Sequence, residues 1–401
     1  MLPLFYVISH YFNLPFRAWE QRKLGEDVNF LNGRAYSQKE LLDKGKYKVL
    51  RVGNFNTNDR WYYSDLELEE NKYANRGDLL YLWATNFGPE IWNQEKVIYH
   101  YHIWKLKIMN INVSKQYLYT WLITDKERIK QSTNGTTMVH VTKGHIEQRE
   151  FQIPPNLTEQ QKIGTFFKQL DDTIALHQRK LDALKLMKKA FSQQIFPENN
   201  RKKPKIRFTS FYEEWEQRKI GEYGYFYYGK SAPKWSVAQD ATTPCVRYGE
   251  LYTKFGPEID IVHSYTNIDK SNLKFSSGNE VLVPRVGENP LDFANCSWLS
   301  ISNVAIGEMI SVYNTEQYPL FIAYYFRSKM KYEFAKRVEG GNVSNLYYSY
   351  LEDILISVPS IEEQKKIAEF LNKIDITINL LQNKLGRIKE LKKAYLQNMF
   401  I

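Results

Sequence analysis

The sequence contains little cysteine and no long apolar run. Only Cys245 and Cys296 occur in 401 residues, too few for a disulfide framework or a thiolate metal site, which favours a reducing compartment. No run reaches the roughly 18 apolar residues that a membrane-spanning helix needs. The aromatic-rich start, Met1 to Phe16, lacks the basic segment of a signal peptide. We therefore expect a cytoplasmic protein without membrane contact.

Catalytic motifs are also missing. The sequence has no Ser-His-Asp pattern, glycine-rich cofactor fingerprint, or methyltransferase or nuclease motif. His100 and His102 fall on one face of a predicted strand, but no further metal ligands accompany them, so packed or DNA-facing imidazoles are favoured. Acidic pairs such as Asp171-Asp172 and Glu362-Glu363 fit helix starts, where the backbone dipole favours negative charge, or solvent faces. We expect a non-catalytic chain with no metal and no cofactor of its own.

One phosphate-loop pattern occurs, because Gly224 to Ser231 matches G-x-x-x-x-G-K-[ST]. Such a loop needs small, flexible residues and an apolar helix directly behind it. Here the variable positions are Tyr-Phe-Tyr-Tyr, and Ala232-Pro233 follow. A strand and a turn are the preferred interpretation, and nucleotide binding through Lys230 and Ser231 remains an alternative.

Basic and aromatic residues are plentiful. The net charge is +10 and is spread along the chain, which favours a polyanionic partner such as nucleic acid. An apolar content of 43%, with 29 Tyr, 22 Phe and 9 Trp, is ample for folded cores.

The main organising feature is a long apolar-periodic helix that occurs twice, at Thr158–Phe196 and Glu362–Phe400, offset by 204 residues. Apolar residues recur every three or four positions in both copies, as one buried stripe requires. Each stripe is longer than one small domain needs, so we expect the two stripes to pack on each other. The stripes also contain Met187 and its counterpart Leu391. The residues expected at the helix–helix interface are Ile163, Phe167, Leu170, Ile174, Leu181, Leu184, Ile367, Leu371, Ile374, Ile378, Leu385 and Ile388.

A second repeat defines the domains, because Trp19-Glu20-Gln21-Arg22-Lys23 returns as Trp215-Glu216-Gln217-Arg218-Lys219. The chain is thus a tandem duplication of a globular segment followed by a helix. We expect an α+β protein with mixed α/β globular segments at 1–155 and 208–358, helices at 156–196 and 359–401, and a basic linker at 197–207. The predicted strands are Tyr47–Val52, Leu79–Trp83, Val97–Leu106, Met138–Val141, Tyr223–Tyr228, Pro244–Tyr248, Glu280–Pro284 and Ile354–Val358.

Candidate DNA contacts are basic, aromatic, amide and hydroxyl residues in the predicted turns. Arg and Asn suit base edges, whereas Lys, Ser and Thr suit phosphates. The first segment supplies Arg51, Asn54, Asn56, Arg60, Trp61, Trp83, Asn86, Thr136 and Thr137. The second segment supplies Lys230, Lys234, Arg247, Tyr248, Lys254, Arg285, Asn342 and Ser344.

Several motifs together carry a family resemblance. They include the paired Trp-Glu-Gln-Arg-Lys openings, Arg51-Val52-Gly53-Asn54-Phe55 and Arg247-Tyr248-Gly249-Glu250-Leu251-Tyr252. Gly77-Asp78-Leu79-Leu80, His102-Ile103-Trp104-Lys105 and a Pro, Glu-Gln and Lys-Ile series before each helix belong to the same set. Along essentially its whole length the chain resembles the DNA sequence-specificity subunit of a type I restriction-modification enzyme.

The resemblance implies two target-recognition domains, each reading half of a bipartite asymmetric site in double-stranded DNA. It also implies that the helices form an antiparallel coiled coil with pseudo-two-fold symmetry, set the spacer and dock two methyltransferase subunits. These partners would bring S-adenosylmethionine for adenine-N6 methylation, and restriction subunits would bring ATP- and Mg-dependent translocation and cleavage. The family places no catalytic residue in this subunit. A helix-mediated interaction scaffold without a DNA role remains an alternative.

Overall fold

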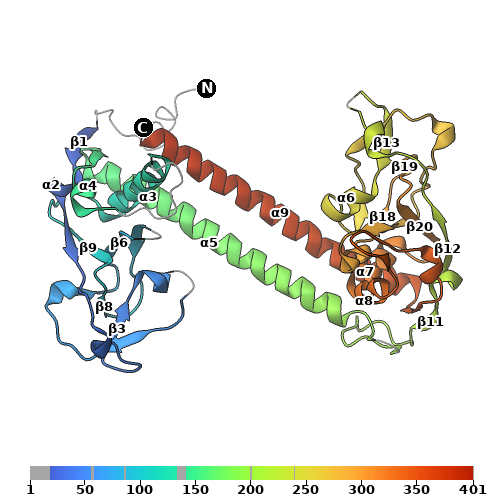
Figure 1. The fold of residues 1–401 in the computed structure, drawn as a ribbon, viewed down its shortest axis with the longest axis horizontal. Coiled ribbons are helices and arrows are strands. Elements are labelled where there is room, and N and C mark those ends of the chain that lie inside the picture. The colour runs from blue at the N-terminus through green and yellow to red at the C-terminus, as the bar shows by residue number, and fades with distance from the viewer. Residues whose placement is uncertain are drawn as a thin grey trace. The chain divides into compact units, whose positions relative to one another are not determined.

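The computed structural model describes residues 19–55, 58–84, 87–132, 141–198, 201–238 and 240–400. The chain forms two compact units, the first made of residues 1–178 and 384–401 and the second of residues 179–383. Each unit thus combines a globular domain with parts of both long helices (Figure 1). None of the described helices is long and apolar enough to cross a membrane.

The two long helices are α5 (Leu157–Gln194) and α9 (Ile361–Met399), each within two residues of its predicted bounds. The Asn156 side chain accepts a hydrogen bond from the backbone N–H of Thr158 at 2.8 Å. Ser360 accepts one from Glu363 N–H at 3.4 Å. These polar side chains satisfy backbone donors that a helix start leaves unpaired, which fixes where both helices begin.

The described residues of the first globular domain form two four-stranded sheets and one strand pair. One sheet has the order β2-β9-β6-β7, and the other has the order β4-β3-β8-β5, in which only β3 and β8 are parallel. The strand pair joins β1 to β10. The strands are β1 (Glu20–Lys23), β2 (Val28–Asn32), β3 (Tyr47–Leu50), β4 (Tyr62–Ser64), β5 (Tyr73–Ala74), β6 (Leu79–Leu82), β7 (Gly88–Ile91), β8 (Val97–Tyr99), β9 (Ile103–Ile108) and β10 (Glu150–Ile153), and the helices are α2 (Leu24–Asp27), α3 (Lys115–Ser132) and α4 (Lys143–Glu147).

The second globular domain contains a five-stranded sheet, β12-β20-β16-β18-β14, and two three-stranded sheets, β15-β13-β19 and β17-β22-β21. The pair β11·β23 corresponds to β1·β10. The strands are β11 (Glu216–Lys219), β12 (Gly224–Tyr228), β13 (Thr243–Val246), β14 (Glu258–Ile259), β15 (Ser264–Thr266), β16 (Glu280–Pro284), β17 (Val286–Gly287), β18 (Ser297–Leu299), β19 (Ala305–Ile306), β20 (Ile310–Thr315), β21 (Glu339–Gly340), β22 (Ser344–Asn345) and β23 (Leu355–Val358), and the helices are α6 (Tyr248–Thr253), α7 (Pro319–Lys329) and α8 (Lys331–Ala335).

Three strand predictions need correction. The predicted strand Val97–Leu106 is two strands, β8 and β9, which lie in different sheets and are joined by a turn at 100–102. The predicted strand Pro244–Tyr248 ends at Val246, because Tyr248 begins α6. For the predicted strand Met138–Val141, residues 138–140 lie outside the described residues, and Val141 belongs to no strand.

Each globular core contains the start of one long helix and the end of the other. In the first unit, Ile163 and Phe167 of α5 pack in one cluster with Met399 of α9 and with Phe400. In the second unit, Ile367 and Leu371 of α9 share a cluster with Ile195 and Phe196, which follow α5. These interface candidates therefore also belong to the domain cores, which makes the helices integral parts of both domains.

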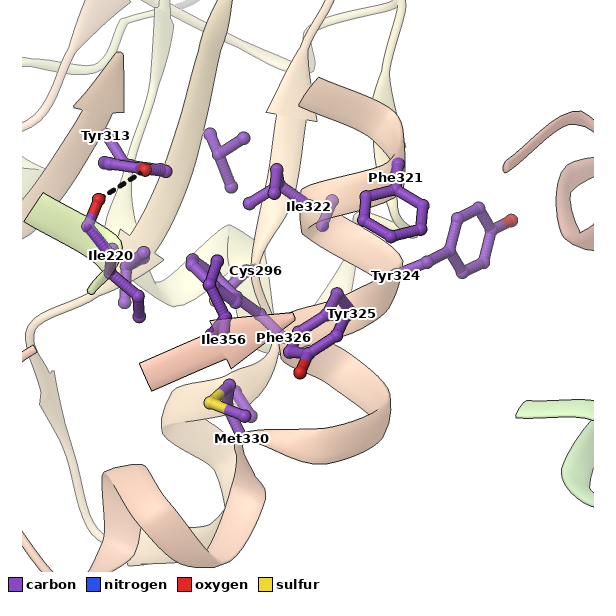
Figure 2. Packing of buried hydrophobic residues seen from close by; sticks show 14 of the residues in the cluster. Ile220, Cys296, Tyr313, Phe321, Ile322, Tyr324, Tyr325, Phe326, Met330 and Ile356 are labelled. Atoms are coloured by element: carbon purple, nitrogen blue, oxygen red, sulfur yellow. Dashed lines mark hydrogen bonds between the residues drawn. The ribbon is translucent and has the colours of Figure 1, made fainter. Parts of the chain in front are cut away.

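Aromatic residues of α7 fill the centre of the second core. Figure 2 shows Phe321, Ile322 and Phe326 among buried neighbours from other elements. The Tyr313 hydroxyl donates a 2.8 Å hydrogen bond to the backbone oxygen of Ile220, which satisfies this buried hydroxyl. In the first unit, Gly164 allows α5 to pack closely on α3, because a Cβ at this position would come within 2.8 Å of Tyr117 N.

The long helices run antiparallel within each unit. In the first unit the rings of Phe166 and Tyr395 lie 5.4 Å apart, and Phe167 is near Phe400. In the second unit the rings of Phe191 and Phe370 lie 5.0 Å apart. The remaining interface candidates are partly or fully buried: Leu181, Ile374, Ile378 and Leu385 are buried, and Leu170, Ile174, Leu184 and Ile388 are half-buried. Met187 and Leu391, which the periodicity placed in the stripes, are instead exposed.

Candidate nucleic-acid interface

The turn after β3 carries the first group of candidates. The Asn54 oxygen accepts from Arg51 N–H at 3.0 Å, and its amide donates to the backbone oxygens of Asn58 and Arg60, both at 3.2 Å. Both ends of the Asn54 amide are therefore engaged with the turn that it shapes. The guanidinium groups of Arg51 and Arg60 lie 4.2 Å and 5.0 Å from the centre of the Tyr62 ring. The turn thus concentrates two positive charges on one aromatic ring.

The two tryptophan candidates of the first domain are half-buried and also pack against other rings. Trp83 stacks on Trp104, and its indole N–H donates to the backbone oxygen of Tyr101 at 2.7 Å. Trp61 packs edge-on against Trp92, beside a core cluster to which strands of both four-stranded sheets contribute. Asn56, Asn86, Thr136 and Thr137 lie outside the described residues.

The histidine pair lies in the turn between β8 and β9, not on a strand face as predicted. His100 contacts the rings of Tyr36, Tyr101 and His102. Burial, together with the nearby charges of His102 and Arg51, lowers the pKa of His100 to about 4. Among the described residues, no group of three or more His, Cys, Asp or Glu side chains could hold a metal ion.

The phosphate-loop pattern does not form a phosphate loop. Gly224–Tyr228 is strand β12, and the chain then turns through Ser231 and Ala232, whose φ values are 64° and 57°. No helix follows directly, so the helix N-terminus that such a loop supplies to a phosphate is missing from this described segment. Lys230 is exposed, and its ammonium donates to the backbone oxygen of Ser271 at 3.4 Å.

Two exposed residues follow this turn. Lys234 was predicted as a DNA contact, whereas its neighbour Trp235, whose surface is 81% exposed, was not. An exposed indole next to a cation is a typical nucleic-acid-binding combination, because every base has a face on which it can stack. Trp235 was not predicted because a single Trp outside a recognisable motif does not by itself indicate a binding site.

The segment after β13 repeats the turn after β3. Arg247 N–H donates to the Glu250 carboxylate at 3.0 Å, as Arg51 N–H donates to Asn54. Glu250 also accepts from Lys254 at 3.1 Å and from Ser264 at 2.7 Å. The charge of Lys254 is therefore shared with a carboxylate of its own turn, which weakens this candidate as a DNA contact.

The remaining candidates surround a cleft in the second domain. The cleft has a volume of about 350 Å³ and is lined by Tyr248, Tyr252, Val286, Gly287, Glu288, Asn289, Asp292 and Val343. Arg285 stands beside this lining, with its guanidinium 4.7 Å from the centre of the Tyr228 ring. Asn342 is exposed, whereas Ser344 is buried in β22 and pairs with Gly287 and Gly340. The structure therefore brings Tyr248 and the turn around Asn342 together at this cleft, whereas the Ser344 side chain is buried in the domain.

Arg34 is a further candidate, which the sequence analysis did not include. Its backbone N–H donates to the Tyr99 oxygen at 3.0 Å, and in the second domain Lys230 N–H donates to the Ile306 oxygen at 2.9 Å. Gly33 and Gly229 precede these cations, and a Cβ at either glycine would come within 2.3 Å or 2.1 Å of a backbone oxygen. Both Gly-cation pairs follow their Trp-Glu-Gln-Arg-Lys motifs at the same distance, and this offset was the available signal.

Comparisons with known proteins agree on one family. The model of the type I restriction modification DNA specificity domain matches twice, at residues 17–186 and 212–390. The specificity subunit of the type I restriction enzyme MjaVIII from Methanocaldococcus jannaschii is 26% identical, covering 94% of this chain and 90% of that protein. The EcoBI specificity subunit from Escherichia coli is 23% identical over 44% of this chain and 38% of its own length. The crystal structure of the M. genitalium type I S subunit has a similar fold, with a TM-score of 0.64 at 12% identity and coverage of 97% and 98%.

Proposed function

The chain belongs to the family of type I restriction-modification DNA specificity domains, and from this premise we propose that each globular domain reads one half of a bipartite, asymmetric target in duplex DNA. The chain is the specificity subunit of such a system, a DNA-recognition subunit that is not itself catalytic. What we propose is that the two globular domains divide the recognition of the DNA target between them.

The observation that supports this division is a shared framework with different surfaces. The pairs β1·β10 and β11·β23 correspond, as do the parallel pairs β3·β8 and β13·β19. The exposed turns built on this framework differ: the Arg60 guanidinium lies on the Tyr62 ring in the first domain, whereas Tyr248 borders a cleft in the second. Equivalent scaffolds with different side chains are what two readers of different sequences require.

An exchange of recognition domains tests the proposal. Residues 17–153 are replaced by the corresponding segment of another specificity subunit, and the hybrid is purified with its modification partner. We expect one half of the methylated target to change and the other half to stay. A hybrid that changes both halves, or an unexchanged complex without bipartite DNA preference, would contradict the proposal. An interaction scaffold without a DNA role would bind its partners but leave duplex DNA free.

We also propose that the long helices set the spacer between half-sites and dock two modification subunits. Exposed apolar residues lie on both helices at equivalent positions: Leu176 is 57% exposed and Leu380, 204 residues later, is 65% exposed. Met187 and Leu391 form a second equivalent pair. Apolar side chains exposed twice at the same helical position fit a partner that binds twice.

Docking is tested by substituting Leu176→Gln and Leu380→Gln together and measuring how much modification subunit co-purifies. Lys180→Gln with Lys384→Gln is the matched control, since these exposed residues lie one turn further along the same helices. We expect the leucine variant to lose modification subunit and the lysine variant to keep it. Equal retention in both variants would contradict this docking surface.

The remaining chemistry is assigned to the partners. Modification subunits would bring S-adenosylmethionine for adenine methylation, and restriction subunits would bring ATP and Mg for translocation and cleavage. Duplex DNA as the substrate, together with two buried free cysteines, supports a cytoplasmic location.

A further inference from the structure

We infer that four cations, Arg34 and Arg51 in the first domain and Lys230 and Arg247 in the second, bind the phosphodiester backbone, while residues that differ between the domains read bases. The inference rests on the proposed function and assigns a task to particular positions within it. It follows from comparing the two domains with each other.

The first pair of positions is fixed by the same backbone geometry. Arg34 and Lys230 each follow a glycine that lets the chain pass close to a carbonyl of the neighbouring segment. Each then donates its backbone N–H to that segment, Arg34 to Tyr99 and Lys230 to Ile306. The side chains of Arg34 and Lys230 therefore begin at equivalent backbone positions in the two domains.

The second pair is fixed in the same way. The residues before them, Leu50 and Val246, each accept a backbone hydrogen bond of 2.9 Å, from His100 and from Gly307 respectively. Arg51 and Arg247 then each donate their backbone N–H to a side chain three residues later, at 3.0 Å in both domains. The start of each arginine side chain is thus held by two equivalent hydrogen bonds.

The two positions are neighbours within each domain. In the second domain, a Cβ built on Gly307 would lie 3.5 Å from Arg247 Cα and 3.8 Å from the Ser231 oxygen, next to Lys230. In the first domain, Arg34 forms a bridge with His100, and the Arg51 charge contributes to the lowered pKa of that histidine. Each domain therefore brings two cations to one junction between its sheets.

The residues around this junction differ between the two domains, whereas its two positive charges occur in both. His100 of the first domain corresponds to Gly307 of the second, and the capping side chains are Asn54 and Glu250. Two domains that read different base sequences still meet the same sugar–phosphate backbone. Positions with the same charge in both domains are accordingly suited to phosphates, and positions that differ are suited to bases.

The first position is arginine in the first domain, Arg34, and lysine in the second, Lys230. This difference favours a phosphate rather than a base as its binding partner. A guanine reader needs two parallel donors, which the arginine fork presents in a fixed plane. Lysine binds a phosphate as a point charge and does not need that fixed plane. Arg34 forms an ion pair with Glu40 at 2.7 Å, whereas Lys230 donates to the Ser271 backbone oxygen and pairs with no carboxylate among the described residues. We therefore expect the larger effect from Lys230.

The test uses the complex of full-length chain and modification subunits with two duplexes, the cognate target and the same duplex with one half-site scrambled. Lys230→Gln and Arg247→Gln are compared with Lys331→Gln, which should leave both affinity and salt slope nearly unchanged. Lys331 is an exposed lysine at the start of α8 in the same domain and is not one of the candidate DNA contacts. Thermal melting of each variant shows that the fold is kept.

We expect Lys230→Gln and Arg247→Gln to weaken binding of both duplexes by the same factor. Each should lower the slope of log affinity against log salt by about 1 and leave the methylated sequence unchanged. Altered base preference, or an unchanged salt slope, would overturn the inference. If the unsubstituted complex does not distinguish the two duplexes, the proposed function fails instead, which separates the two outcomes.

Discussion

The ammonium group of Lys392 on α9 forms an ion pair with the Asp171 carboxylate on α5 in the first unit. The second unit contains the equivalent pair with the helices exchanged, between Lys188 on α5 and Asp375 on α9. Residues 204 positions apart thus serve as each other's counterparts, so one repeated sequence supplies both sides of an antiparallel helix contact. Asp171, which the sequence placed at a helix start or on a solvent face, is an interhelical partner.

Reversing the charges of this pair tests the helix contact. Asp171→Lys places two ammonium groups together and should destabilise the first unit by about 1 kcal/mol, since the pair is partly exposed and screened by water. Adding Lys392→Asp should restore most of the loss, as measured by urea unfolding. A double variant no more stable than Asp171→Lys would show that the two side chains do not interact.

Buried glutamines at the helix starts should contribute more. The Gln160 oxygen accepts from Ser114 N–H at 2.8 Å, and its amide donates to the oxygens of Asn112 and Pro154. Gln364 makes the equivalent hydrogen bonds with Tyr318 N–H and the Pro359 oxygen. Replacing Gln160 with Leu leaves these buried groups unpaired and should cost about 2–3 kcal/mol in the free energy of unfolding.

Gln169→Leu is the control for Gln160→Leu, because Gln169 is an exposed residue of the same helix. Urea unfolding should leave the midpoint of this control nearly unchanged. Similar midpoints for both variants would mean that the buried glutamine does not join α5 to the first domain.

The His100 turn should make the first domain sensitive to acid. Burial, with the charges of His102 and Arg51, lowers the pKa of His100 to about 4, whereas an unfolded histidine titrates near 6.5. Between these values the unfolded chain binds one proton more than the folded chain. Stability is therefore retained above about pH 6.5 and falls as the pH drops towards 4.

Melting temperatures measured from pH 7 to 4 test the contribution of His100. His100→Gln should flatten part of this decline, whereas substitution of the exposed His145 should not. Parallel curves for the unsubstituted chain and His100→Gln would contradict the assignment.

Both cysteines should be unreactive in the folded protein. Burial raises the pKa of Cys245 to about 11 and raises the pKa of Cys296 further. Since the thiolate is the reactive form, a disulfide reagent at pH 8 should label neither thiol quickly. Rapid labelling is expected only in guanidinium, and fast labelling of the native chain would indicate an open second domain.

The sequence predicted the long helices closely because their periodicity extends over many turns. Local sequence patterns predicted the structure less well where contacts between distant parts of the chain determine it. Val97–Leu106 is predicted as one strand, yet its two halves belong to different sheets. The sequence also does not show that Trp83, a candidate DNA contact, stacks on Trp104. Arg34 and Lys230 each follow a glycine, but in the sequence only the repeat offset connects these two Gly-cation pairs.

Methylation mapping tests the central claim most directly. The chain is expressed with its modification subunit in a host that lacks other adenine methyltransferases, and methylated adenines are located by sequencing the genome. The account predicts a target of two different specified segments separated by a fixed number of unspecified bases. A single uninterrupted methylated sequence would contradict it.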